Sequence, residues 1–92
     1  MKRARATVQH AVGLHARPAA RFVKRAKEYE SAITVRNITR DGETVDAKSL
    51  VKVIKIAAAQ RQEVEIVADG PDEEEALAAL LIFLDDVSEE ER

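Results

Sequence analysis

The sequence predicts an α+β domain in which helices pack on one side of a single antiparallel sheet. Two observations lead to this prediction. Short segments of alternating apolar and polar residues, typical of half-buried strands, are interspersed with segments whose apolar residues recur every three or four positions, which is typical of helices. Taken in order they give βαββαβα, and short strands combined with helices that bury one face fit a two-layer arrangement of this kind.

The first strand is expected over residues 3–9, where apolar side chains at every second position face one side. The pattern changes after Gly13. A helix follows, and its apolar stripe consists of Ala19, Phe22, Val23 and Ala26. Pro18 suits the first turn of that helix, because a backbone N–H has no helical partner there.

A hairpin is expected next, because two short apolar segments flank Asp41-Gly42. The residues that mark its strands are Ile33 and Val35 on one side and Thr44 and Val45 on the other. Residues 63–68 alternate again and predict a further strand, whose inward residues are Val64, Ile66 and Ala68.

The last helix is expected to begin after Gly70-Pro71, with Asp72 as its N-cap and acidic residues in its first turn. Its buried stripe is expected to consist of Leu77, Leu80, Leu81, Leu84 and Val87. Residues 88–92 are expected to form a fraying tail, and nothing along the chain marks an internal domain boundary, so residues 1–92 are interpreted as one domain.

A second helix is expected over residues 49–59, and it carries apolar residues on two faces. One stripe consists of Val53, Ile56 and Ala57, and the other of Leu50, Val51 and Ile54. A surface helix needs only one apolar stripe to join the core. The second stripe is therefore either buried under another element or exposed for a partner.

Composition excludes several classes of protein. The chain has 92 residues and no cysteine, so it has no disulfide, no thiolate nucleophile and no cysteine metal site. One tyrosine, two phenylalanines and no tryptophan argue against a stacking platform for single-stranded nucleic acid. No apolar run is long enough to span a membrane, and the first residues lack the apolar core of a signal peptide. The expected location is the cytoplasm.

Charge is distributed unevenly along the chain. Residues 1–61 contain 14 Lys and Arg against 5 Asp and Glu, a net charge of +9, whereas residues 62–92 carry a net charge of −11. A basic half of this kind fits a surface for nucleic acid and equally fits a surface for acidic partners.

The segment from Gly13 to Ala20 carries the strongest indication of chemistry. It places His15 directly before a helix start and Arg17 two residues later. The free backbone N–H groups of Ala16 and Arg17 would point out of the helix N-terminus, where anions bind well, and the helix dipole disfavours an imidazolium there. Arg17 also offers a planar fork of donors to phosphate oxygens. Such a site can accept and release a phosphoryl group.

The segment Gly13-Leu14-His15-Ala16-Arg17-Pro18-Ala19-Ala20 resembles the active-site signature of the HPr family, the histidine phosphocarriers of the bacterial sugar phosphotransferase system. A second block, Ala47-Lys48-Ser49-Leu50-Val51-Lys52-Val53, resembles the family's regulatory-serine and docking segment. The resemblance covers essentially the whole chain, with about three extra residues in the hairpin. It implies an open-faced sandwich of four antiparallel strands with three helices on one face.

The resemblance also implies a function. His15 would take a phosphoryl group on Nδ1 from phosphorylated enzyme I and pass it to the A domain of a sugar-specific enzyme II, while Arg17 neutralises its charge. The protein would be a carrier rather than an enzyme, without cofactor or metal, and not bound to nucleic acid or inserted in a membrane. We also expect a monomer, because no large apolar surface is left over apart from the docking surface. An HPr kinase/phosphorylase is a further candidate partner, and the sugar or pathway served stays open.

Docking residues follow from the same resemblance. The family's partner surface corresponds to Ala20, Lys24, Lys27, Leu50, Val51, Lys52 and Ile54. Ser49 is either a regulatory phosphorylation site or only a helix cap. Two positions depart from the family pattern: Val12 stands where a polar residue often caps the active-site loop, and Arg61 stands where many members have a turn glycine.

Two alternative functions remain open at this stage. The basic half could belong to a module that binds nucleic acid or acidic ligands, which salt-dependent retention on DNA or RNA would favour. The chain could also serve a nitrogen-regulatory or dihydroxyacetone-kinase relay, because such carriers share similar histidine-centred signatures. His10, the second histidine, is assigned a structural or solvent-exposed role.

Overall fold

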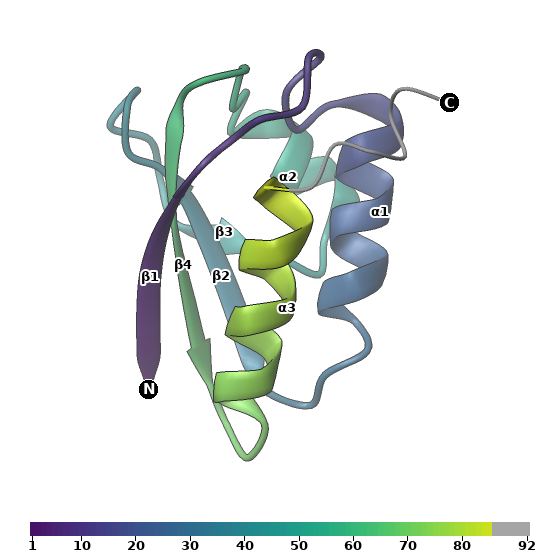
Figure 1. Cartoon of the computed structure of the whole chain (residues 1–92), viewed down its shortest axis with the longest axis vertical. Helices are drawn as coiled ribbons and strands as arrows, with labels where there is room; N and C mark the ends of the chain where they lie inside the picture. The colour runs from purple at the N-terminus through teal and green to yellow at the C-terminus, as the bar shows by residue number, and fades with distance from the viewer. Residues whose placement is uncertain (86–92) are drawn as a thin grey trace.

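The computed structural model, which describes residues 1–85, has the predicted order of elements (Figure 1). The chain runs through β1 (Lys2–Thr7), α1 (Ala16–Ala26), β2 (Ala32–Asn37), β3 (Val45–Asp46), α2 (Leu50–Lys55), β4 (Glu63–Asp69) and α3 (Glu73–Asp85). Asp41-Gly42 lies in the connection between β2 and β3, which pair with each other, so the predicted hairpin is confirmed.

The four strands form one sheet in the order β1-β4-β2-β3, and each neighbouring pair is antiparallel. β4 therefore lies inside the sheet, where Ile66 is paired with Ala4 of β1 on one side and with Val35 of β2 on the other. All three helices lie on the same side of this sheet (Figure 1). The predicted α+β open-faced sandwich is confirmed.

The core lies between the sheet and the helices, as the alternation and the helical stripes predict. Fully buried residues include Val64, Ile66 and Ala68 of β4, Ala19, Phe22 and Ala26 of α1, and Leu80 and Leu84 of α3. Leu81 is half-buried against this core. Val87 and residues 88–92 lie outside the described residues. Within residues 1–85, none of the helices has the length and apolar character needed to cross a membrane.

The second helix is shorter than predicted. It was expected over residues 49–59 but spans Leu50–Lys55, with Ile56 as its C-cap. Ala57 follows with φ 51° and is exposed, so its predicted place in the buried stripe is wrong. A left-handed residue cannot continue a right-handed helix, and the apolar pattern does not reveal that change of backbone conformation. Val53 and Ile56 are buried as predicted.

Asp72 precedes α3 as predicted, but its carboxylate serves a different segment. Oδ2 accepts a hydrogen bond from the Glu30 backbone N–H (2.8 Å), and Oδ1 accepts from the Ser31 N–H (2.9 Å) and hydroxyl (2.5 Å). At the start of α3, the Glu73 carboxylate accepts from the Gly70 N–H (3.1 Å). The predicted capping role of Asp72 is thus replaced by a tertiary contact that holds the α1–β2 connection.

These hydrogen bonds predict how stability depends on pH. The Ser31 hydroxyl, followed by the Glu30 N–H, holds the pKa of Asp72 below its ordinary value of 3.8. The Gly70 N–H and then the N-terminal ammonium hold the pKa of Glu73 below 4.5. A depressed carboxyl pKa stabilises the fold above the unfolded-state value, and this contribution disappears as pH falls through the folded-state value. The free energy of unfolding should therefore decrease below about pH 4.

Urea unfolding of the wild type and of Asp72→Asn at pH 7 and pH 3 measures this effect. The variant should lose less stability between the two pH values, because its amide keeps an acceptor oxygen but does not titrate. Parallel losses in both proteins would contradict the assignment to Asp72.

Candidate active site

Gly13 and Leu14 form the turn that leads to α1, and the backbone N–H of each residue donates a hydrogen bond. Gly13 adopts φ 71° and its N–H donates to the His10 carbonyl (2.9 Å). Leu14 is fully buried, and its N–H donates to the Ala58 carbonyl at 2.7 Å. The backbone that leads into His15 is therefore fixed by packing and by a hydrogen bond to a loop far away in the sequence.

His15 is the N-cap residue of α1, with extended backbone (φ −141°, ψ 155°) and an exposed side chain. Its imidazole makes no capping hydrogen bond, so the ring is presented outward instead of closing the helix. Arg17, in the first turn, is exposed as well, whereas Pro18 and Ala19 are buried and fix the helix against the core. The structure thus holds the backbone of this segment while leaving both polar side chains accessible.

Ala16 adopts a left-handed backbone conformation with φ 50°. For a residue with a Cβ this conformation costs about 1–2 kcal/mol, so the chain is strained where it enters α1. Sequence reasoning expected the Ala16 and Arg17 N–H groups to point out of a regular helix start and did not foresee this strain. Their use as phosphate donors stays a prediction.

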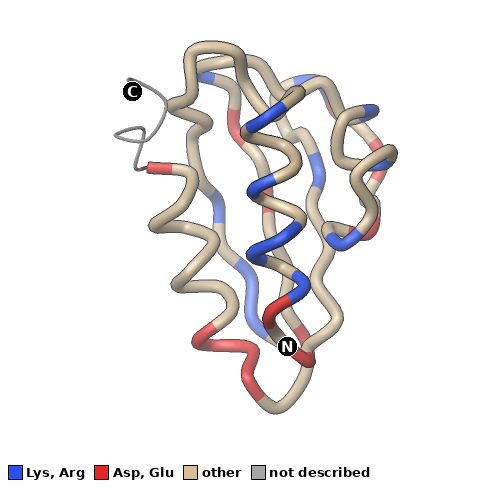
Figure 2. The backbone as a smooth tube through the Cα atoms, turned by 90° about the vertical axis from the view of Figure 1, so that its right-hand side faces the viewer, with Lys and Arg blue, Asp and Glu red and all other residues tan. Residues whose placement is uncertain are grey.

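The predicted docking residues lie on α1 and α2, which pack against each other, except for Lys27, which is the C-cap of α1. Figure 2 shows Lys and Arg recurring along α1. The exposed members of the set are Ala20, Lys24, Lys27, Leu50, Val51 and Lys52. Leu50 and Val51 are 41% and 66% exposed. These two residues of the second apolar stripe of α2 therefore lie on the surface and not under another element. Ile54 differs from the prediction, because it is half-buried and packs against the core.

Ser49 is the N-cap of α2, and its hydroxyl accepts a hydrogen bond from the Lys52 backbone N–H at 3.5 Å. Its predicted role as a helix cap is confirmed. Its phosphorylation stays a prediction.

Comparison with known proteins identifies the family. The family described as "PTS HPr component phosphorylation site" matches residues 2–86, nearly the whole chain. This chain belongs to the HPr family. The phosphocarrier protein HPr of Haemophilus influenzae is 46% identical over 72 residues, which cover 78% of this chain and 81% of that protein. A crystal structure of HPr from Thermoanaerobacter tengcongensis superposes with a TM-score of 0.86 at 38% identity and covers 92% of each chain.

Longer relatives also contain this unit. The multiphosphoryl transfer protein of Vibrio cholerae is 47% identical over 73 residues, which cover 79% of this chain. The match spans only 18% of that relative's length, and 15% of the multiphosphoryl transfer protein of Haemophilus influenzae. The HPr fold therefore occurs both as a small protein and as part of a much larger one.

Both departures from the HPr pattern are visible in the structure. Val12 is 59% exposed, so its side chain reaches solvent where the family often has a polar cap. Arg61 adopts φ 73°, the left-handed conformation that glycine takes at no steric cost. Its N–H donates to the Val8 carbonyl at 2.7 Å. The turn is therefore kept despite the missing glycine, at the cost of local strain.

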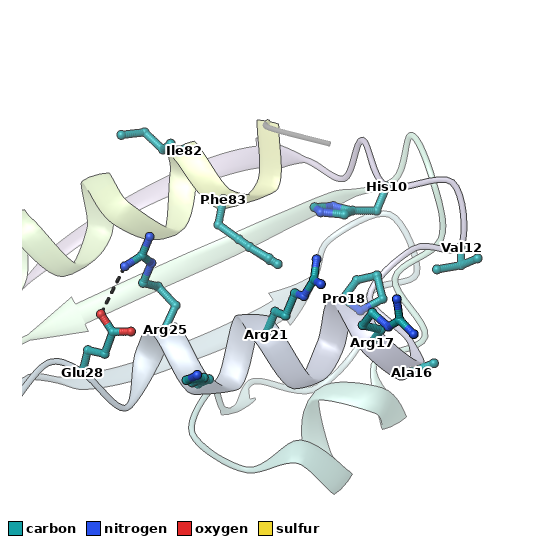
Figure 3. Close-up of a pocket in the computed structure, with 11 residues that line it drawn as sticks. His10, Val12, Ala16, Arg17, Pro18, Arg21, Arg25, Glu28, Ile82 and Phe83 are labelled. Atoms are coloured by element: carbon teal, nitrogen blue, oxygen red, sulfur yellow. Dashed lines mark hydrogen bonds and ion pairs between the residues drawn. The ribbon is translucent and has the colours of Figure 1, made fainter. Parts of the chain in front are cut away.

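Sequence analysis left a structural or a solvent-exposed role open for His10, and the structure shows the structural one. His10 is 5% exposed, its ring centroid lies 5.0 Å from that of Phe83, and its Nδ1 has no hydrogen-bond partner in the structure. Figure 3 shows it at one end of a groove of about 600 Å³ between α1 and α3. Arg17 and Arg21 of α1 and Ile82 of α3 also line this groove.

Sequence reasoning missed the connection between α2 and β4 as a part of the site. The Ala58 carbonyl fixes Leu14, and a Cβ added to Gly13 would come within 2.3 Å of that same oxygen. The only signal in the sequence is Gly13 itself, which indicates a tight turn but does not identify the segment against which it packs.

Gly13→Ala should destabilise the fold by about 2–3 kcal/mol, since it adds both left-handed strain and overlap with backbone atoms. Gly42→Ala is the matched control, because its Cβ would meet nothing closer than the Asn37 carbonyl at 3.7 Å. Urea unfolding of both variants measures the difference. Equal stability of the two would show that the contact between Gly13 and Ala58 does not constrain the turn.

Proposed function

We propose that this chain carries a phosphoryl group on His15, taken from phosphorylated enzyme I and passed to the A domain of an enzyme II. The observation that carries the proposal is the exposed imidazole of His15, fixed through its backbone at the N-terminus of α1 and not engaged in capping. Membership in a family defined by a phosphorylation site supports it.

The chemistry uses groups that this chain provides. An unprotonated ring nitrogen, Nδ1 in this proposal, attacks phosphorus as the bond between phosphorus and the donor breaks, and the second transfer reverses these roles with the acceptor. Arg17 offsets negative charge on the phosphoryl oxygens as the group moves. The chain returns to its starting state after each pair of transfers, so it acts as a carrier and not as an enzyme with a substrate of its own.

Incubation with enzyme I and phosphoenolpyruvate tests this function. The wild type should gain one phosphate that is lost in acid and retained in alkali, as expected for phosphohistidine. A phosphate that survives acid, or no uptake with an enzyme I that phosphorylates another HPr, would contradict the proposal.

We expect partners to dock on the exposed surface formed by Leu50, Val51, Lys24, Lys27 and Lys52, and association to weaken as salt screens the lysines. Val51→Glu should weaken enzyme I binding at least about tenfold, because it places a negative charge where an acidic partner binds. Its thermal midpoint should stay unchanged, since Val51 is 66% exposed. Isothermal titration calorimetry measures the affinity.

Ala78→Glu is the matched control. Ala78 is also exposed, but it lies on α3 and is not one of the residues that line the groove beside Arg17. This variant should bind enzyme I like the wild type. Equal losses of affinity in both variants would show that added charge, and not the proposed surface, governs binding, and a loss of stability in Val51→Glu would assign Val51 to the core.

A further inference from the structure

The α2–β4 connection, residues 56–62, packs against the turn formed by Gly13 and Leu14, which leads into His15. It accepts the Leu14 N–H at the Ala58 carbonyl (2.7 Å) and leaves no room for a side chain at Gly13. It is also joined to the end of β1, because the Arg61 N–H donates to the Val8 carbonyl (2.7 Å) and the Val8 N–H donates to the Gln62 carbonyl (2.9 Å). Any shift of this connection therefore moves the backbone that leads into His15.

The same connection contains two strained residues. Ala57 and Arg61 both have positive φ, at 51° and 73°. Such conformations persist only where the surrounding structure imposes them, so the connection needs contacts that hold it in place.

The side chains of Asn37 and Gln62 provide those contacts. Asn37, at the end of β2, is fully buried. Its Nδ2 donates to the Ile56 carbonyl (2.9 Å) and to Gln62 Oε1 (3.1 Å), and Gln62 Oε1 also accepts the Ala59 N–H (2.9 Å). Asn37 Oδ1 accepts the Arg40 N–H (3.2 Å), so the amide is satisfied at both atoms. The two amides tie both ends of the connection to the sheet.

We propose that Asn37 and Gln62 are positioning residues for phosphoryl transfer at His15, acting through the Ala58 carbonyl and the Leu14 N–H. The proposal rests on the proposed function. Neither residue touches the transferring group. Their hydrogen bonds keep the acceptor for Leu14 fixed, and this narrows the range of orientations open to the His15 backbone. Transfer rates are sensitive to such placement, because a displacement of about 1 Å can cost about a hundredfold in rate.

The proposal predicts a specific pattern for substitutions of Gln62. Gln62→Met removes the acceptor and keeps the length of the side chain, whereas Gln62→Glu keeps an oxygen that can accept from both Asn37 and Ala59. We expect the maximal rate of transfer from enzyme I to fall about tenfold in Gln62→Met, with KM within about twofold of the wild type, and to recover in Gln62→Glu. Asn37→Asp, which loses the donor, should behave like Gln62→Met.

Hydrogen exchange and a stability control separate positioning from folding. The Leu14 amide should exchange faster in Gln62→Met than in the wild type, measured well below the thermal midpoint. Ile33→Val is the stability control. It shortens a core side chain that is 1% exposed and lies on β2, four residues before Asn37. Both variants are measured at the same number of degrees below their own thermal midpoints. Under these conditions Ile33→Val should transfer the phosphoryl group at the wild-type rate, and its Leu14 amide should exchange as slowly as in the wild type.

A wild-type rate in Gln62→Met, or an equal loss of rate in Ile33→Val, would overturn the positioning role while leaving His15 as the carrier. Absence of phosphate on the wild type itself would overturn the proposed function, and the positioning role with it.

Discussion

Replacing His15 by alanine should abolish uptake of phosphate from enzyme I and phosphoenolpyruvate. Within residues 1–85 the only other histidine is His10, which is 5% exposed and packs against the Phe83 ring. A buried ring cannot approach a phosphorus atom held by another protein, so no second imidazole can substitute. Autoradiography or intact-protein mass spectrometry measures the uptake.

Two controls complete this prediction. Because His15 is exposed and makes no capping hydrogen bond, His15→Ala should unfold at the thermal midpoint of the wild type. His10→Gln should keep its ability to take up acid-labile phosphate. Uptake by His15→Ala that is lost in His10→Gln would move the carrier role to the buried histidine and refute the proposed site.

Replacing Arg17 by alanine should slow transfer strongly and leave stability unchanged. The side chain is exposed and makes no hydrogen bond or ion pair with any of residues 1–85, so little folding energy depends on it. A charge-assisted contact to a transferring phosphoryl group is worth about 2–4 kcal/mol of barrier, or roughly 30- to 1,000-fold in rate. Rapid-quench measurement of a single transfer from phosphorylated enzyme I gives this rate.

Arg17→Lys and Arg40→Ala are the two control variants for this measurement. Lysine keeps the charge but lacks the planar fork, so Arg17→Lys should transfer at an intermediate rate. Arg40 is an exposed arginine on the β2–β3 connection, and Arg40→Ala should transfer normally. A normal rate in Arg17→Ala together with a lower thermal midpoint would assign Arg17 to folding.

The sequence by itself determined the order of elements and the position of His15 directly before a helix. Alternation in β4 and the apolar stripe of α1 report which face of each segment is buried, and this is a property of neighbouring residues. The block from Gly13 to Ala20 likewise placed His15 before a helix, and the structure confirms that position. Both are local features, so a linear pattern is sufficient to reveal them.

Only the tertiary structure decided which distant segments meet. Asp72 binds Ser31, 41 residues away, although its position alone predicts a helix cap. The turn at Gly13 rests on Ala58, and Asn37 holds that support in place through Gln62. These contacts join groups that become neighbours only after the sheet and helices have packed together, and residue spacing does not record which backbone carbonyl will face which N–H. The precise placement of His15 depends on them.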